Sequence, residues 1–261
     1  MRPVDAGDLT VEQVKVSFGG IVALDAVSLT VAPNRIVGVI GPNGAGKTTL
    51  FNVVCGFVAS DSGRISYRGR RLGGHRPHDL AELGIARTLQ DVGLWRGLTV
   101  VENVMAGGTA SPAVGLVSAL VGLGRSPRGE RQLRARAMAV LDRLRIAEHA
   151  ERSPGVLAYS IQKRVGLARA LMGKPSLLLL DEPASGLSGS EVDALRRLLA
   201  ELRSDMAVLL VEHHMDLVMS VCDDLVVLNF GRVIASGAPD AIRTNPEVTT
   251  AYLGEEVPSG A

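Results

Sequence analysis

The fold of this chain is decided by one stretch near its N-terminus, Gly41-Pro42-Asn43-Gly44-Ala45-Gly46-Lys47-Thr48-Thr49. The stretch has the form G-x-x-x-x-G-K-T, which is the spacing of a phosphate-binding loop in nucleoside triphosphatases. Its glycines let backbone N–H groups curl around the phosphates without side-chain clashes. Lys47 would add a positive charge for the same phosphates, and the Thr48 hydroxyl is placed to ligate magnesium. The whole stretch is therefore a candidate nucleotide site.

The surroundings of the loop favour this interpretation. The apolar residues 36–40 predict a buried strand before it, and residues 48–54 predict a helix after it, whose N-terminus attracts anions. The alternative is a glycine-rich turn without a ligand. The complete motif between a strand and a helix argues against that alternative.

The composition argues against several other functions. A chain of 261 residues with 46% hydrophobic residues can bury a sizeable core. A formal net charge of +1 and only 3% aromatic residues argue against nucleic acid as a partner. Cys55 and Cys222 stand in apolar helical contexts, which predicts buried, reduced thiols in a cytosolic protein. No secretory signal and no apolar stretch of about 20 residues is present, so a membrane role would come through a partner.

The pattern along the chain predicts the architecture. Residues 9–40 alternate apolar and polar positions as strands do, residues 62–72 predict an edge hairpin, and residues 84–89 predict a strand that ends at Gln90. The sequence pattern between residues 98 and 153 predicts helices. Apolar residues recur there at helical spacing, at Leu133, Ala137, Val140, Leu141 and Leu144.

Helices and strands alternate beyond Leu157, which favours a mostly parallel sheet. We therefore expect an α/β fold with a P-loop nucleoside triphosphatase core. An N-terminal antiparallel β subdomain and a helical lobe inserted at residues 93–160 complete it, within a single domain spanning residues 1–261.

A second group of candidate residues follows an apolar strand. Four leucines at residues 177–180 lead directly into Asp181 and Glu182. Ligands of open α/β sheets gather at the carboxyl ends of the strands. Asp181 would hold magnesium, and Glu182 would orient the attacking water or accept its proton. The alternative is an N-cap pair before the next helix, which the upstream Lys47 disfavours.

Three further residues are candidates with less specific signals. The carboxamide of Gln90 could link magnesium to the helical lobe, or could be an ordinary polar strand end. His213 follows an apolar strand and could bond a γ-phosphate. The neighbouring Glu212 and His214 lack the i, i+4 spacing of a helical metal site. The Phe18 ring could stack on an adenine or be a core aromatic.

Together these motifs resemble the ATP-binding subunit of ABC transporters over nearly the whole chain. The strings VSFGGIVALDAVSL, GIARTLQDVGLWRGLTVVENV and VEHHMDLVMSVCDDLVVLNFGRVIASGAPDAI, with the tail NPEVTTAYLG, resemble the subgroup of branched-chain amino-acid importers. The resemblance implies that Phe18 stacks on adenine and that residues 41–49 are the Walker A loop. It implies likewise that Gln90 is the Q-loop glutamine, that Asp181 and Glu182 are the Walker B pair, and that His213 is the switch histidine.

The chain departs from the family pattern in its signature segment, Leu157-Ala158-Tyr159-Ser160-Ile161. Glycine and glutamine are expected where Ser160 and Ile161 stand. Serine adds a Cβ where backbone must approach the partner subunit's γ-phosphate, and isoleucine removes polar capacity. Ser160 could still act as an N-cap and offer its hydroxyl to nucleotide. Ser188 likewise replaces the usual aspartate or asparagine in the loop after Walker B.

These departures affect only residues offered to the partner's ATP. We therefore predict an asymmetric heterodimer with a paralogous ATPase subunit, in which the Walker site of this chain is the active one. The alternative is that both substitutions are tolerated and both sites work.

The resemblance implies an ATPase that uses ATP and Mg²⁺ to drive a membrane permease, on the cytoplasmic face of the membrane. An extracytoplasmic solute-binding protein would take part indirectly. A non-hydrolysing regulatory subunit and a soluble ABC ATPase outside transport are the alternatives. The retained Glu182 and His213 argue against the first, and the absence of a tandem module or a coiled-coil insertion argues against the second.

Overall fold

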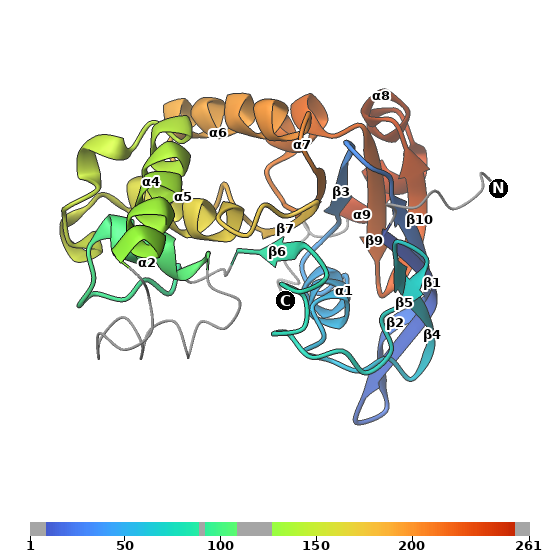
Figure 1. Ribbon diagram of the computed structural model, residues 1–261. Coiled ribbons are helices and arrows are strands. Elements are labelled where there is room, and N and C mark those ends of the chain that lie inside the picture. Colours follow the sequence, from blue (N-terminus) through green and yellow to red (C-terminus); the bar gives the residue numbers. More distant parts are fainter. Residues whose placement is uncertain (1–8, 89–91, 109–126, 254–261) are drawn as a thin grey trace.

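Two sheets and a group of helices make up the molecule (Figure 1). The computed structural model describes residues 9–88, 92–108 and 127–253. Sheet A has four strands in the order β2-β1-β4-β5, and sheet B has six strands in the order β10-β9-β3-β8-β7-β6. Among these residues no helix is both long enough and apolar enough to cross a lipid bilayer.

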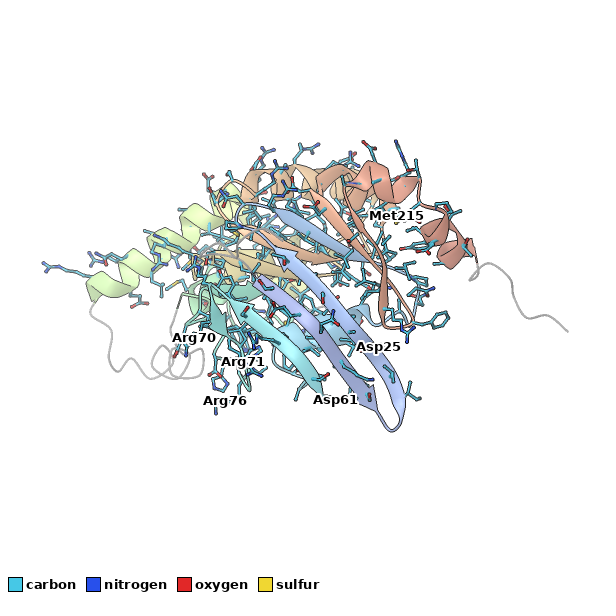
Figure 2. All side chains as sticks on the ribbon, turned by 90° about the vertical axis from the view of Figure 1, so that its right-hand side faces the viewer. Asp25, Asp61, Arg70, Arg71, Arg76 and Met215 are labelled. Atoms are coloured by element: carbon cyan, nitrogen blue, oxygen red, sulfur yellow. The ribbon has the colours of Figure 1, made fainter. Side chains whose placement is uncertain are left out.

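Sheet A is the antiparallel sheet expected from the N-terminal alternation. Its strands are β1 (Leu9–Phe18), β2 (Ile21–Val31), β4 (Ser62–Tyr67) and β5 (Arg70–Arg71). The predicted edge hairpin is confirmed as β4 and β5. The solvent-facing side carries charged residues such as Asp25, Arg70 and Arg71, seen in Figure 2. Asp25 also accepts hydrogen bonds from Arg232, which ties sheet A to sheet B.

Sheet B is parallel except for its last strand, as the sequence predicts. Its strands are β3 (Ile36–Ile40), β6 (Ile85–Arg87), β7 (Leu177–Asp181), β8 (Ala207–Val211), β9 (Asp224–Asn229) and β10 (Arg232–Gly237). Only the pair β9–β10 is antiparallel. Central strands are apolar throughout because both faces are covered. In β7, Leu178 and Leu180 join one hydrophobic cluster while Leu177 and Leu179 join the other.

Each cluster belongs to one face of sheet B. One face packs against helices α5 (Tyr159–Leu171), α6 (Gly189–Leu202) and α7 (Met215–Val221). The other face packs against α1 (Lys47–Val54) and sheet A. Cys55 and Cys222 are buried free thiols, as predicted, and burial raises the pKa of Cys55 to about 12. The chain ends, within the described residues, in α8 (Pro239–Arg243) and α9 (Pro246–Leu253).

The helical region between β6 and β7 forms the far end of the molecule in Figure 1. It contains α2 (Val100–Ala106), α4 (Pro127–Arg143), the short 3₁₀ turns η1 (Ala147–His149) and η2 (Pro154–Val156), and α5. The apolar positions predicted for α4 and its C-terminal end are buried at Leu133, Ala137, Leu141 and Leu144, whereas Val140 is only partly buried.

Candidate nucleotide site

The phosphate-loop motif lies between β3 and α1, where the sequence places it. Two of its glycines cannot be replaced without a clash. A Cβ on Gly41 would lie 2.1 Å from the carbonyl oxygen of Leu228, and a Cβ on Gly46 would lie 2.6 Å from that of Ala23. Both glycines also have a positive φ, +149° and +101°, which side-chain residues rarely adopt. The loop is thus shaped by the close approach of neighbouring backbone.

Lys47 is the buried cation of this loop. It opens α1, is only 7% exposed, and donates hydrogen bonds to the carbonyls of Gly41 (2.6 Å) and Pro42 (2.7 Å). Its ammonium therefore reaches back over the loop rather than into solvent. Thr48 follows in the first turn of α1 with an exposed side chain, as ligation of an ion outside the loop requires.

Three adjacent strands deliver the other candidate residues to one edge of sheet B. Strand β8 lies between β3 and β7, and Val211 at its end pairs with Val39 on one side and Asp181 on the other. The Glu182 N–H donates to the carbonyl of Val211 at 2.9 Å. The phosphate loop, the Asp181–Glu182 pair and His213 consequently follow neighbouring strands at the same edge, as the sequence predicts from the parallel alternation.

Asp181 sits in a strongly negative environment. Burial, followed by the charges of Glu182 and Glu212, raises the pKa of Asp181 to about 6, while Lys47 lowers it. A divalent cation at this edge would neutralise that negative charge, so the donor set fits magnesium. No three His, Cys, Asp or Glu side chains form a metal cage within the described residues. Magnesium at phosphate sites uses one or two carboxylates with phosphate and water ligands, and Asp181 with Thr48 suits that arrangement.

His213 and Glu182 lie side by side. The Nδ1 atom of His213 is 3.7 Å from one carboxylate oxygen of Glu182 and 3.7 Å from one of Glu212. These separations exceed a hydrogen bond, so the imidazole is near both carboxylates without being fixed by either. The His213 side chain is 56% exposed and open to a ligand from outside. Glu182 has a φ of 45°, a left-handed conformation uncommon for a residue with a side chain.

Glu212 is a site residue that the sequence analysis missed. Its side chain is fully buried and accepts hydrogen bonds from three backbone N–H groups: Ala184 at 2.7 Å, His213 at 2.8 Å and His214 at 3.0 Å. One carboxylate thus joins the loop after Glu182 to the segment that carries His213. The sequence does offer a signal for Glu212, because it is an acidic residue directly after a buried apolar strand. Its neighbours His213 and His214 suggest only a metal ligand, and the sequence pattern does not predict its structural role.

The remaining predictions have mixed outcomes. Phe18 ends β1 and is 51% exposed, so the alternative of a core aromatic is wrong. The other strand of its hairpin, β2, contacts the phosphate loop near Gly46. Gln90 falls outside the described residues. Beyond it, Arg169 of α5 donates to the carbonyls of Val92 (3.0 Å) and Gly93 (2.9 Å), which anchors that segment.

The proposed N-cap role of Ser160 is wrong. Helix α5 begins at Tyr159 with Ala158 as its N-cap, because the N–H groups of Ile161 and Gln162 both bond the carbonyl of Ala158. Ser160 is therefore the second helical residue. Ile161 packs against the hydrophobic core. By contrast, Ser188 is an N-cap, since it forms a capping box with Glu191 at the start of α6.

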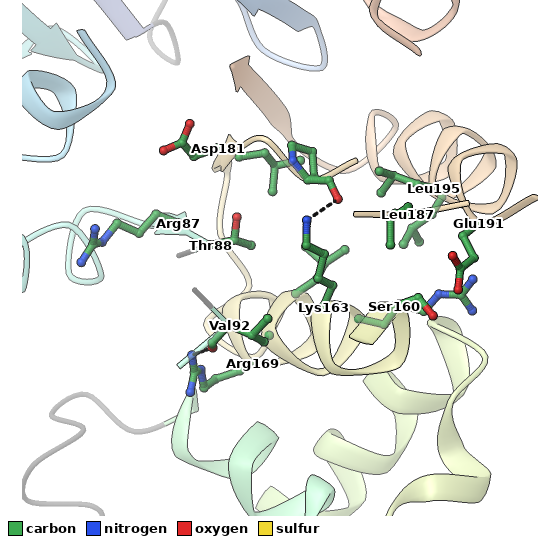
Figure 3. A pocket seen from close by; sticks show the side chains of 16 residues that line it. Arg87, Thr88, Val92, Ser160, Lys163, Arg169, Asp181, Leu187, Glu191 and Leu195 are labelled. Carbon is green, nitrogen blue, oxygen red and sulfur yellow. Dashed lines mark hydrogen bonds between the residues drawn. The ribbon is translucent and has the colours of Figure 1, made fainter. Parts of the chain in front are cut away.

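A cleft separates the start of α5 from the end of β7. The space between them is open to solvent and measures about 770 Å³. Figure 3 shows Asp181 and Arg87 at one end, Ser160 and Glu191 at the other, and Lys163 between them. Lys163 is a second residue that the sequence analysis did not single out.

Comparison with known proteins agrees with this geometry. A family model described as ABC transporter matches residues 24–185, and one described as branched-chain amino acid ATP-binding cassette transporter matches residues 232–258. The chain is 42% identical to the high-affinity branched-chain amino acid transport ATP-binding protein BraF of Pseudomonas aeruginosa, over 97% of this chain and 99% of BraF. It is 41% identical to LivG of Escherichia coli, over 95% of this chain and 98% of LivG.

Solved structures resemble the fold at similar coverage. A nucleotide-free ATP-binding cassette from an ABC transporter superposes with a TM-score of 0.82 at 30% identity, over 94% of this chain and 98% of that one. The ADP conformation of an ATP-binding cassette gives a TM-score of 0.80 at 28% identity, over 95% and 99% of the two chains.

Proposed function

This chain belongs to the ABC transporter family of ATP-binding proteins, and we propose that it energises an importer of branched-chain amino acids. It is a nucleotide-binding ATPase whose partners are membrane permease subunits. The amino-acid class is supported by the names of BraF and LivG and by the model that matches residues 232–258. A solute-binding protein and the permease would select the solute, and this chain would act at the cytoplasmic face of the membrane.

The reaction is attack of water on the γ-phosphorus of ATP, with the bond to the bridging oxygen breaking and ADP leaving with its electron pair. Glu182 orients the water and takes its proton. Lys47 and the loop N–H groups stabilise the negative charge on the phosphoryl oxygens. His213, open to solvent beside Glu182, hydrogen-bonds the γ-phosphate. Asp181 and Thr48, with Gln90, would hold Mg²⁺, which when bound neutralises phosphate charge.

The observation that carries these roles is the meeting of Lys47, Asp181, Glu182 and His213 at one edge of sheet B. It is tested by ATP hydrolysis of the purified chain, alone and with its paralogous subunit, against the Glu182→Gln variant. We expect turnover to fall by at least about 100-fold in the variant, as loss of a general base does. Turnover that survives the substitution would refute the role of Glu182.

Residues 93–160 are proposed as the inserted helical lobe that contacts the permease. Support comes from the mutual packing of α2, α4 and α5 through residues such as Val104, Leu141 and Val165. The two hydrogen bonds from Arg169 hold the segment after Gln90 against α5. A movement at the γ-phosphate would thereby reach the lobe.

An asymmetric heterodimer is the proposed assembly. All residues that act within this chain are retained, while the signature offers serine and isoleucine to the partner's nucleotide. Ile161 is packed against the core, which reduces the polar groups that this signature can offer a phosphate. Robust turnover by this chain alone, equal at both sites, would overturn the asymmetry.

The transported class has its own test. Uptake of radiolabelled leucine, isoleucine and valine is measured in cells lacking this gene and in cells complemented with wild-type or Glu182→Gln protein. We expect wild type alone to restore uptake. Unchanged uptake in the deletion strain, with loss of uptake of another solute, would refute the amino-acid assignment while leaving the ATPase in place.

A further inference from the structure

One lysine of helix α5 holds the loop that follows Glu182. The Nζ atom of Lys163 donates to the backbone carbonyls of Glu182 (3.1 Å), Pro183 (3.1 Å) and Ser185 (2.6 Å). A lysine ammonium has three donors and no acceptor, so these bonds use its full capacity. Figure 3 shows the side chain extending across the cleft toward this loop.

The loop is also shaped by backbone bonds, among them one from the Ser185 N–H to the carbonyl of Glu182 at 3.1 Å. Glu182 is in a left-handed backbone conformation, which a residue with a side chain adopts only when its surroundings impose it. Its own N–H is fixed by Val211, and Ala184 is fixed by the buried carboxylate of Glu212. The carbonyls of Glu182, Pro183 and Ser185 all accept from Lys163, and no other side chain is recorded as donating to them among the described residues. The lysine therefore completes the constraint on the backbone that carries the Glu182 carboxylate.

The Lys163 ammonium is affected both by partial burial and by nearby charges. Burial lowers the pKa of Lys163, while the charges of Glu212 and Glu182 act to raise it. The ammonium also lies 5.2 Å from the centre of the Tyr159 ring, a favourable cation–π arrangement. The lysine thus contacts three backbone carbonyls of the loop and an aromatic residue of the signature segment, in the field of two carboxylates of the site.

Ser160 lies on the same side of the cleft as Lys163. It stands three residues before Lys163, so both side chains leave the same face of α5, and both line the cleft opposite Glu191. The Glu191 carboxylate accepts hydrogen bonds from the backbone N–H (2.8 Å) and the hydroxyl (2.7 Å) of Ser188. The start of α5 is therefore attached to the loop after Glu182 through Lys163.

We propose that Lys163 is a positioning residue for ATP hydrolysis, which couples the signature end of α5 to the orientation of Glu182. The proposal rests on the hydrolytic role of Glu182 stated above. Lys163 touches no reacting atom in this arrangement. It acts by holding the carbonyls around Glu182, so that movement of the signature on the partner's ATP changes the placement of the carboxylate in this chain.

The test compares Lys163→Met with wild type in the assembled complex of this chain, its partner ATPase and the permease. Methionine keeps the length of the side chain and removes all three donors. We expect kcat to fall about 10- to 100-fold, the scale of a displaced reacting group. The KM for ATP should stay within about twofold, because the phosphate loop is untouched. Lys174→Met, at an exposed lysine beyond the end of α5, is the matched control and should leave both constants unchanged.

A double-mutant cycle separates positioning from mere loss of structure. Single-turnover hydrolysis is measured for Lys163→Met, Glu182→Gln and the double variant. If Lys163 acts through Glu182, the double variant hydrolyses ATP no more slowly than Glu182→Gln alone. Melting temperatures and fluorescent ATP binding verify folding. Should Lys163→Met fail to fold, Lys163→Leu, which likewise has no donor, serves in its place with the same expectation.

The outcomes distinguish this inference from the proposed function. Turnover that persists in Glu182→Gln refutes the catalytic assignment itself. Loss of turnover in Glu182→Gln, together with unchanged kcat in the Lys163 variants, overturns only the positioning role. Multiplying rate losses in the double variant, or a raised KM with unchanged kcat, would also overturn it.

Discussion

Glu212 offers the sharpest test of how this site is built. Its carboxylate is fully buried and accepts three backbone N–H groups, from Ala184, His213 and His214. The substitution Glu212→Ala removes all three acceptors at once. Glu212→Gln keeps the size of the side chain but replaces one acceptor oxygen with an NH₂ group that faces a backbone donor.

The size of the effect follows from these contacts. A buried donor left without an acceptor costs about 1–3 kcal/mol, which for three donors sums to roughly 3–9 kcal/mol. Release of the penalty for burying a charge and entry of water offset a part of this cost. We therefore expect a net loss of about 3 kcal/mol for Glu212→Ala and about 2 kcal/mol for Glu212→Gln. The turnover number should also fall roughly tenfold or more, because both Glu182 and His213 lose their support.

Urea unfolding followed by circular dichroism measures the loss in free energy, and steady-state hydrolysis measures turnover. Glu201→Gln is the matched control, because its side chain is 50% exposed and 3.8 Å from Arg145. Such a surface pair contributes at most about 1 kcal/mol. A loss below about 1 kcal/mol in Glu212→Ala, with turnover unchanged, would refute the idea that this carboxylate organises the site.

Three further predictions concern the charge, the loop and the signature. The folded pKa of Asp181, about 6, exceeds its unfolded value of 3.8. The folded state therefore binds the proton more tightly, and this group's destabilisation is absent below about pH 3.8 and fully developed above pH 6. With chelator present, we expect Asp181→Asn to gain more stability over wild type at pH 7 than at pH 5, measured by urea unfolding; an equal gain would contradict this. Gly46→Ala should abolish fluorescent ATP binding because its Cβ would lie 2.6 Å from a backbone oxygen, whereas Gly44→Ala, with open space around its Cβ, should weaken binding less. Equal losses would show that strain at positive φ, and not the close contact, decides. The double substitution Ser160→Gly with Ile161→Gln should raise turnover at the partner's site. It is measured in a heterodimer in which the site of this chain is inactivated by Glu182→Gln, so that the remaining turnover comes from the partner's site. Unchanged turnover would mean that the natural signature is competent.

The sequence predicted the site where local patterns decide the geometry. Apolar strands that end in Asp181 or just before His213 must meet if the sheet is parallel, because their carboxyl ends share one edge. The same reasoning located the phosphate loop after β3. The hydrogen bonds that join the segments after β7 and β8 were not predicted. No pattern in the sequence shows that three backbone N–H groups donate to the carboxylate of Glu212. The helix start at Tyr159 was missed because Ala158 accepts both first bonds without any side-chain cap.

Two features of the structure bear on how the signature segment acts. Ile161, where the family pattern has glutamine, packs against the hydrophobic core and carries no polar group for the partner's phosphate. Lys163, further along the same helix α5, donates to the carbonyls of Glu182, Pro183 and Ser185. If the start of α5 moves when the signature meets the partner's ATP, these bonds carry the movement to the hydrolytic carboxylate of this chain.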